Sequence, residues 1–357
     1  MIVLYNIVNS QNGVQSSRVD NNICWREEKN FSGSKNMYHQ IAGIKTFSVL
    51  FLFVYMAFWW GCGGDSGINQ APKTDFDNPG LVEIIGYPTA IYQNVQEPFI
   101  SRDGQYLFFS SGQSEFNKDL LYAKWDITQD SFVFQGEIQG VNTASNLEAN
   151  PTMDENYNFF YINNTAAPAW ISTGIFQPET MDLSSNTSIL GLPSIELSGS
   201  TATVNMGVEI SSDGNTLYFS RAVFLNAGQP NQVISASDIL FAKKIGDAFV
   251  YDETTAVMIM QNINTDEDLE YAACISEDGL EIFFTRLTSD TITDETPDSQ
   301  IMRAVRPNTS EAFSVPQPVD GIPNHSKFVE APTLYGNTLY YHQFDDGVAN
   351  LYKVTMQ

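Results

Sequence analysis

One motif recurs five times along the chain. Its first copy, EPFISRDGQYLFFSS, covers residues 97–111, and related stretches begin at Glu148, Gly207, Ala272 and Glu330. Aligned on Asp103, Asp154, Asp213, Asp278 and Tyr335, every copy has two aromatic residues five and six positions later: Phe108–Phe109, Phe159–Phe160, Tyr218–Phe219, Phe283–Phe284 and Tyr340–Tyr341. Aromatic residues make up only 13% of the chain, so this agreement is not chance. Five copies of one supersecondary unit therefore determine the fold.

Each unit reads as four β-strands. The aromatic strand is apolar at consecutive positions, which predicts burial on both faces of its sheet. A third apolar run follows, as in DLLYAKW from Asp119 and DILFAKK from Asp238, and its weakest version surrounds Ile175. No stretch has a clear 3.6-residue apolar period, so we expect little helix.

Asp-Gly pairs lie between the first two strands of three copies. Asp103, Asp213 and Asp278 each precede a glycine, and such pairs supply the positive φ angles of a tight hairpin. We therefore interpret these aspartates as turn formers and not as catalysts.

Five units predict an all-β fold, a five-bladed β-propeller of four-stranded antiparallel blades. The last copy ends at Gln357 just after its third strand. The segment Leu81–Gln93 is similar to a fourth strand, so we expect the ring to close by pairing of the N-terminal and C-terminal strands, which removes an exposed edge.

The pattern E-P-x-x-S-x-D-G-x-x-L-x-F-S, followed by D-L-L-Y, resembles the TolB-type, WD40-like propeller repeat of bacterial envelope proteins. The resemblance covers residues 81–357. It departs in the second copy, where Glu155–Asn156 replaces the turn glycine, and in the fifth, which lacks the aspartate. The resemblance implies a propeller of the cell envelope, but such propellers serve as protein-binding modules, as partners of peptidase domains and as lipoproteins.

The N-terminal region indicates export. Residues 1–36 are polar, and either are disordered or precede the true start at Met37. From Met37 the chain reads as a lipoprotein-type signal peptide, 37–62, whose apolar run Thr46–Gly61 is shorter than the roughly 20 residues of a spanning helix. Cys62 is then the predicted lipidation site, and residues 63–80 form a flexible tether. We therefore expect a lipoprotein that is anchored in the outer membrane, on either its periplasmic or its cell-surface side. The alternative is an uncleaved signal anchor.

Charge and cysteine content exclude several classes of site. The net charge of −25 disfavours nucleic acid as a partner. Cys24, Cys62 and Cys274 cannot build a disulfide framework or a zinc site, and we expect Cys274 to be a buried structural thiol. We expect no metal cofactor. Acidic loops at 266–268 and 290–298 leave Ca²⁺ open, although solvated surface acid is the simpler interpretation.

Carboxylates are the remaining candidates for chemistry. Only His325 and His342 follow the signal, and no nucleophile elbow or phosphate loop is present. The first strands carry Glu97, Glu148, Glu209, Glu270 and Glu330, which could form an acidic ring at one channel mouth and bind a cation, a sugar or a basic peptide. Alternatively they hydrogen-bond backbone amides of neighbouring blades, or two of them act as acid and base in glycoside hydrolysis. Trp125 and Trp170 could stack on a sugar.

The sequence thus predicts a membrane-tethered binding or scaffold module with an envelope protein or glycan as partner. The alternative is a glycan-active hydrolase with paired carboxylates at the channel. A purely structural lipoprotein is the third possibility. No catalytic residue can be assigned.

Overall fold

The computed structural model describes residues 74–357, apart from 115–116, 178–181, 184–186, 230 and 295–296. The expected signal peptide, Cys62 and most of the expected tether lie outside the described residues. Among the described residues, no helix has the length and apolar character needed to cross a membrane.

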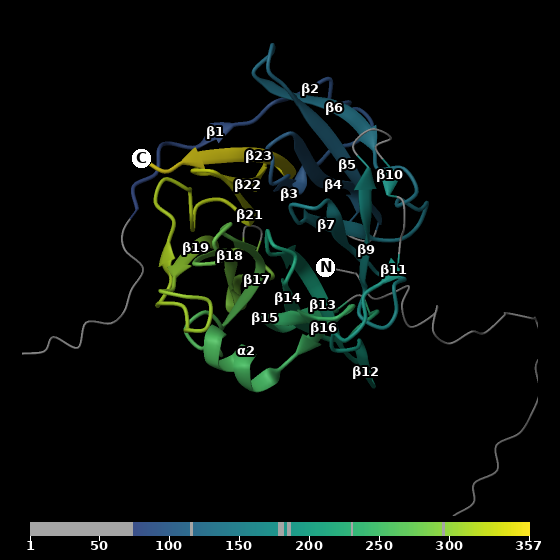
Figure 1. Cartoon of the computed structure of the whole chain (residues 1–357), viewed down its shortest axis with the longest axis vertical. Helices are drawn as coiled ribbons and strands as arrows, with labels where there is room; N and C mark the ends of the chain where they lie inside the picture. The colour runs from purple at the N-terminus through teal and green to yellow at the C-terminus, as the bar shows by residue number, and fades with distance from the viewer. Residues whose placement is uncertain (1–73, 115–116, 178–181, 184–186, 230, 295–296) are drawn as a thin grey trace, which may run out of the picture. The chain divides into compact units, whose positions relative to one another are not determined.

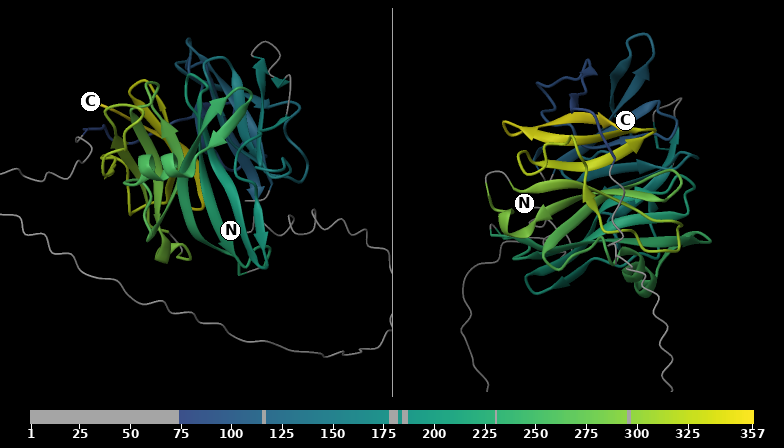
Figure 2. Two further views of the ribbon diagram at one scale, coloured as in Figure 1. Left: turned by 60° about the horizontal axis from the view of Figure 1, so that its bottom comes forward. Right: turned by 90° about the vertical axis from the view of Figure 1, so that its left-hand side faces the viewer.

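Five small β-sheets are arranged in a ring, as Figure 1 shows, and Figure 2 gives two further views. The predicted five-bladed propeller of antiparallel blades is confirmed. The innermost strands of successive blades are β3 (Gln96–Ile100), β7 (Glu148–Met153), β13 (Thr201–Ile210), β17 (Asp268–Ile275) and β21 (Val329–Tyr335).

The remaining strands build each blade outward. Blade 1 continues with β4 (Tyr106–Ser114), β5 (Asn117–Asp126), β6 (Ser131–Glu137) and β2 (Ile84–Ile85). Blade 2 has β8 (Asn158–Asn163), β9 (Ile171–Gln177), β10 (Asp182–Leu183) and β11 (Thr187–Ser188). Blade 3 has β14 (Thr216–Leu225), β15 (Val233–Ile245) and β16 (Ala248–Tyr251), and the short β12 (Glu196–Ser198) pairs with the other edge of β13. Blade 4 has β18 (Glu281–Thr288), β19 (Ser299–Val305) and β20 (Gln317–Pro318). Blade 5 has β22 (Thr338–Asp345), β23 (Val348–Thr355) and β1 (Gly80–Leu81).

The two ends of the propeller pair with each other, as expected. β1 pairs antiparallel with β23, and Phe76 forms a further bridge with Met356. The paired segment begins earlier than the sequence suggested, inside the stretch expected to be tether. The next residues, Ile84–Ile85, pair parallel with β6 of blade 1 instead.

The aromatic pairs of the repeat form the core between blades. All ten residues are buried, from fully covered Phe108 and Phe109 to Tyr340 at 9% exposure. The prediction that this strand is covered on both faces is confirmed, because neighbouring blades pack against each other.

Pairing within the blades corrects the alignment of the second copy. Phe99 pairs with Phe108 in blade 1, but Thr152 pairs with Phe160 and not with Phe159 in blade 2. The hairpin turn of blade 2 is one residue shorter, so Asp154 takes the place of Ser101 and accepts the hydrogen bond that closes the turn. The three Asp-Gly turns are as predicted, with φ of 73° at Gly104 and 71° at Gly214 and Gly279.

Helix is sparse, as expected. The described residues include the α-helix α2 (Glu253–Met260) and the 3₁₀-helix η1 (Ser289–Thr291). Asp252 caps α2 by accepting from the backbone N–H of Thr255. This helix was not anticipated, because its eight residues bury only Ala256, Ile259 and Met260, which is too short a pattern to indicate a helix in the sequence.

Each innermost strand carries a β-bulge at the same place. The register shifts after Gln96, Ala149, Met206, Tyr271 and Glu330. In each case the following residue has a positive φ near 50°: Glu97, Asn150, Gly207, Ala272 and Ala331. A bulge bends the strand and re-aims its side chains. The bulges therefore decide which residues face the channel.

Candidate functional site

A cavity of about 420 Å³ lies at the end of the channel where the innermost strands begin. All five bulges contribute to its floor, because Glu97, Asn150, Gly207, Ala272 and Ala331 line it. Its volume falls within the range of about 300–1,000 Å³ that is typical of small-molecule sites. Beneath it the channel narrows to a space of about 30 Å³. We call this cavity the cup.

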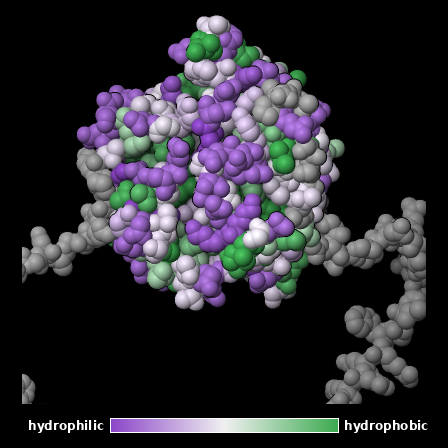
Figure 3. Space-filling model, in the orientation of Figure 1, coloured by the Kyte–Doolittle hydropathy of each residue, from purple (hydrophilic) through white to green (hydrophobic). Residues whose placement is uncertain are grey.

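The wall of the cup is apolar. Side chains from blades 2 to 5 contribute to it, including Ile162, Trp170, Phe224, Leu287, Phe328 and Phe344. Phe328 and Phe344 contact each other with ring centroids 5.4 Å apart. Such a wall favours a ligand with a substantial apolar part. The face shown in Figure 3 is mostly hydrophilic, with small scattered hydrophobic groups.

An ion pair forms one side of the floor. Lys118 Nζ lies 2.9 Å from Glu97 Oε1, and their side chains are only 7% and 15% exposed. The other carboxylate oxygen of Glu97 accepts hydrogen bonds from the Ser110 hydroxyl and the Asn150 backbone N–H. Burial alone would raise the pKa of Glu97, but Lys118 and the Ser110 hydroxyl outweigh it and lower the pKa. Glu97 is therefore ionised at neutral pH.

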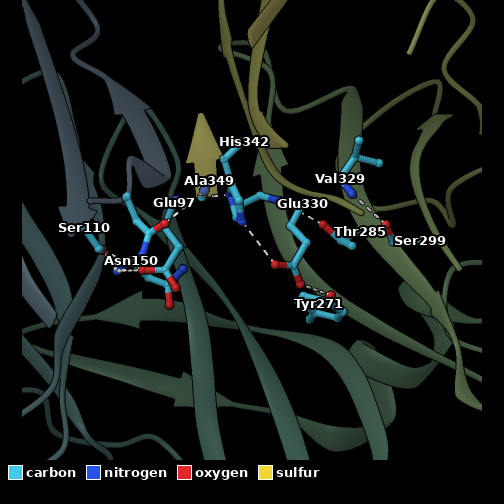
Figure 4. A network of polar contacts seen from close by, with 12 residues as sticks. Glu97, Ser110, Asn150, Tyr271, Thr285, Ser299, Val329, Glu330, His342 and Ala349 are labelled. Carbon is cyan, nitrogen blue, oxygen red and sulfur yellow. Dashed lines mark hydrogen bonds and ion pairs between the residues drawn. The ribbon is translucent and has the colours of Figure 1, made fainter. Parts of the chain in front are cut away.

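A chain of three side chains forms the other side of the floor, as Figure 4 shows. His342 Nδ1 accepts from the backbone N–H of Glu97 at 3.3 Å, and Nε2 lies 3.1 Å from Glu330 Oε2. An acceptor at Nδ1 places the proton of the neutral ring on Nε2, which then donates to Glu330. The Tyr271 hydroxyl donates to the other oxygen of Glu330. Both carboxylates of the cup are thus fully engaged by protein groups.

The remaining three predicted glutamates do not line the cup. Glu148 and Glu270 are fully buried and accept equivalent bonds, from the backbone N–H and the hydroxyl of Thr143 and of Thr265 respectively. Glu270 also pairs with Arg286 at 2.8 Å. Burial raises the pKa of Glu148 to about 7 and also raises that of Glu270. The expected ring of five acids is therefore reduced to Glu97 and Glu330 at the cup.

Glu209 lies in the narrow part of the channel, where it pairs with Arg102 at 2.9 Å. The same guanidinium donates to the backbone carbonyl groups of Met153 and Ile210. Arg102 thereby links blades 1, 2 and 3.

The bulges explain why the ring was overestimated. Alternation along an unbroken strand would place Glu209 and Glu270 on one face, but a bulge lies between these two positions in the repeat. A bulge interrupts the alternation of side chains between the two faces of the sheet, so counting alternate residues across it assigns them to the wrong face. Whether the five glutamates bind a ligand stays a prediction.

The other candidates are placed as follows. Trp170 lines the cup, whereas Trp125 packs edge-on against Phe132. His325 is exposed and pairs with Asp298. Cys274 is buried, as predicted. Within the described ranges, no three His, Cys, Asp or Glu side chains are grouped so that they could hold a metal ion.

Four polar residues of the floor escaped the sequence analysis: Gln96, Lys118, Asn150 and Tyr271. Gln96, Asn150 and Tyr271 border the bulges of the innermost strands. A comparison of the five copies at these positions would have singled out these three residues, because the positions vary where the rest of the motif repeats.

No family model and no curated protein matches the chain. Solved structures do match. A glycoside hydrolase superposes with a TM-score of 0.50 at 12% identity, over 80% of this chain and 92% of that one. An endo-arabinanase of family GH43 from Bacillus licheniformis has a TM-score of 0.42 at 12% identity, over 74% and 93% of the chains. TolB from Acinetobacter baumannii has a TM-score of 0.35 at 10% identity, over 74% and 54%. At these identities the likeness is one of fold.

Proposed function

We propose that the chain is a binding module of the bacterial envelope, and that its propeller holds a ligand in the cup. The observation that carries the proposal is a cavity with apolar walls and a small polar floor at the point where all five blades meet. A lipid on Cys62 and the tether that follows it would hold the propeller at a membrane surface. There the cup would bind an envelope protein or a glycan that carries an apolar group.

The cup is tested with an environment-sensitive apolar dye. We expect the dye to bind the full chain and to lose affinity in Met206→Trp, which narrows the cup at a position where blade 4 already has the aromatic Tyr271. Ile127→Trp is the matched control, because Ile127 is 85% exposed and does not line the cup. Equal binding by both variants would contradict the proposal.

The tether is tested separately by metabolic labelling with an alkyne-tagged fatty acid in a bacterial host. We expect label on the full chain and none on Cys62→Ser. Label that persists in Cys62→Ser would exclude Cys62 as the lipidation site.

A glycan-active hydrolase is the second candidate, because Glu97 and Glu330 are two carboxylates in one cavity. A hydrolase needs an acid that is protonated near neutral pH beside an ionised one. Glu97 is held ionised by Lys118, and Glu148, with its pKa of about 7, does not line the cup. This pattern favours binding. Release of reducing sugar from envelope glycans by the wild-type chain, and its loss in Glu330→Gln, would reverse that preference.

A further inference from the structure

The floor of the cup contains a buried amide without a protein partner. Gln96 is only 4% exposed and lines the cup, yet its side chain makes no hydrogen bond with any described residue. The amide is reached from the open space of the cup, where water or a ligand head group can hydrogen-bond to it. The side chain of Asn150, which also lines the cup, likewise has no partner among the described residues.

The charged and acidic side chains around these amides already have protein partners. Lys118 pairs with Glu97, and Glu330 receives hydrogen bonds from Tyr271 and His342. A carboxylate or an ammonium group on a ligand would have to compete with these contacts and lose its hydration in an apolar cavity. The floor therefore disfavours a charged group and offers amide N–H and C=O groups to a neutral one.

We propose that the cup selects an uncharged amphiphile, whose apolar body lies against the wall and whose amide or hydroxyl head group hydrogen-bonds to Gln96 and Asn150. This inference rests on the proposed binding function and narrows it to one chemical class. An amide head can donate and accept at once, as the two side chains also do. A site built to hydrogen-bond a group discriminates strongly against analogues that cannot satisfy it.

The experiment uses medium-chain compounds that share one alkyl chain and differ only in the head group: a primary amide, an alcohol, a carboxylate and an ammonium. Each displaces the apolar dye from the full chain, below the concentration at which it forms micelles. We expect the amide and the alcohol to bind at least about tenfold more tightly than the two charged compounds, which corresponds to about 1.4 kcal/mol.

Two variants assign the preference to the floor. Gln96→Met removes the amide and introduces the residue that blade 3 has at the equivalent position, Met206. Asn150→Gly keeps the positive φ of 49° accessible and introduces the residue that blade 3 has as Gly207. We expect both to weaken the amide about tenfold relative to the dye, whose affinity is measured directly for each variant. Gln105→Leu, on an exposed glutamine of a hairpin turn, is the control and should change nothing.

The outcomes separate the two proposals. If neither the dye nor any compound binds, the proposed function fails together with this inference. If the dye binds in the cup but the charged compounds bind as tightly as the amide, or if neither variant changes the preference, only this inference is overturned.

Discussion

The imidazole of His342 accepts a hydrogen bond at Nδ1 from the backbone N–H of Glu97, and this bond joins the last blade to the first. The same contact recurs around the ring with hydroxyl acceptors. The bulge N–H groups of Asn150, Ala272 and Ala331 donate to Ser110, Ser220 and Thr285 of the preceding blade. His342 is therefore the blade 5 member of a series that joins four of the five bulges to the preceding blade; in blade 2 the equivalent position is the apolar Ile162.

Removal of one such acceptor should destabilise the ring. Thr285→Val keeps the shape of the side chain but leaves the N–H of Ala331 without its acceptor, so we expect the free energy of unfolding to fall by about 1–3 kcal/mol. Urea denaturation measures this. Ile162→Val is the control at the apolar equivalent position of blade 2, with an expected loss of about 0.5–1.5 kcal/mol from packing alone. A Thr285→Val loss no larger than the control would argue against the locking role.

The Arg102–Glu209 pair should behave as one unit. Arg102→Met leaves the 5% exposed carboxylate of Glu209 without its counter-charge, so we expect a loss of about 3–5 kcal/mol. The double variant with Glu209→Gln should recover part of that loss, because no buried charge remains. Lys327→Met, at a half-exposed ion pair with Asp345, should cost about 0–1 kcal/mol. Additive losses in the double variant would contradict the coupling.

Glu148 should make the protein less stable as the pH rises. Burial raises the pKa of Glu148 from 4.5 to about 7, so the folded state binds its proton more tightly than the unfolded state does. Its contribution is fully present below pH 4.5 and is lost as the pH rises towards about 7, by at most roughly 3 kcal/mol. We expect Glu148→Gln to remove this decline in urea denaturation over pH 4–8. Glu83→Gln, on an exposed glutamate, controls for the lost charge, and parallel pH curves for wild type and Glu148→Gln would refute the assignment.

Cys274 should react with thiol reagents only when the fold opens. It is 2% exposed, its Sγ accepts from the backbone N–H of Leu334 at 3.1 Å, and burial raises its pKa. In a Cys24→Ser, Cys62→Ser background, we expect labelling to be slow in buffer and to rise with urea in step with unfolding. Labelling in buffer at the rate seen in denaturant would show that the thiol is accessible in the folded protein.

The repeat made the architecture predictable, because Phe108–Phe109 and their counterparts specify strands covered on both faces and the Asp-Gly pairs specify the turns. The closing strand was placed a few residues too late, since Phe76 lies in a polar stretch without an apolar pattern. The site was harder to predict from the sequence. Alternation along a strand predicts its faces only until a bulge, and no residue type marks these bulges: Glu97, Asn150 and Ala331 all adopt the positive φ that glycine prefers.

The residue before each bulge lines the cup in all five blades: Gln96, Ala149, Met206, Tyr271 and Glu330. These five positions differ in size, polarity and charge although the sheets that present them are alike. Substitutions there change what the cup can recognise without disturbing the aromatic core between blades. The propeller can therefore diverge towards new ligands one blade at a time, with most of its stability supplied by residues that the ligand never touches.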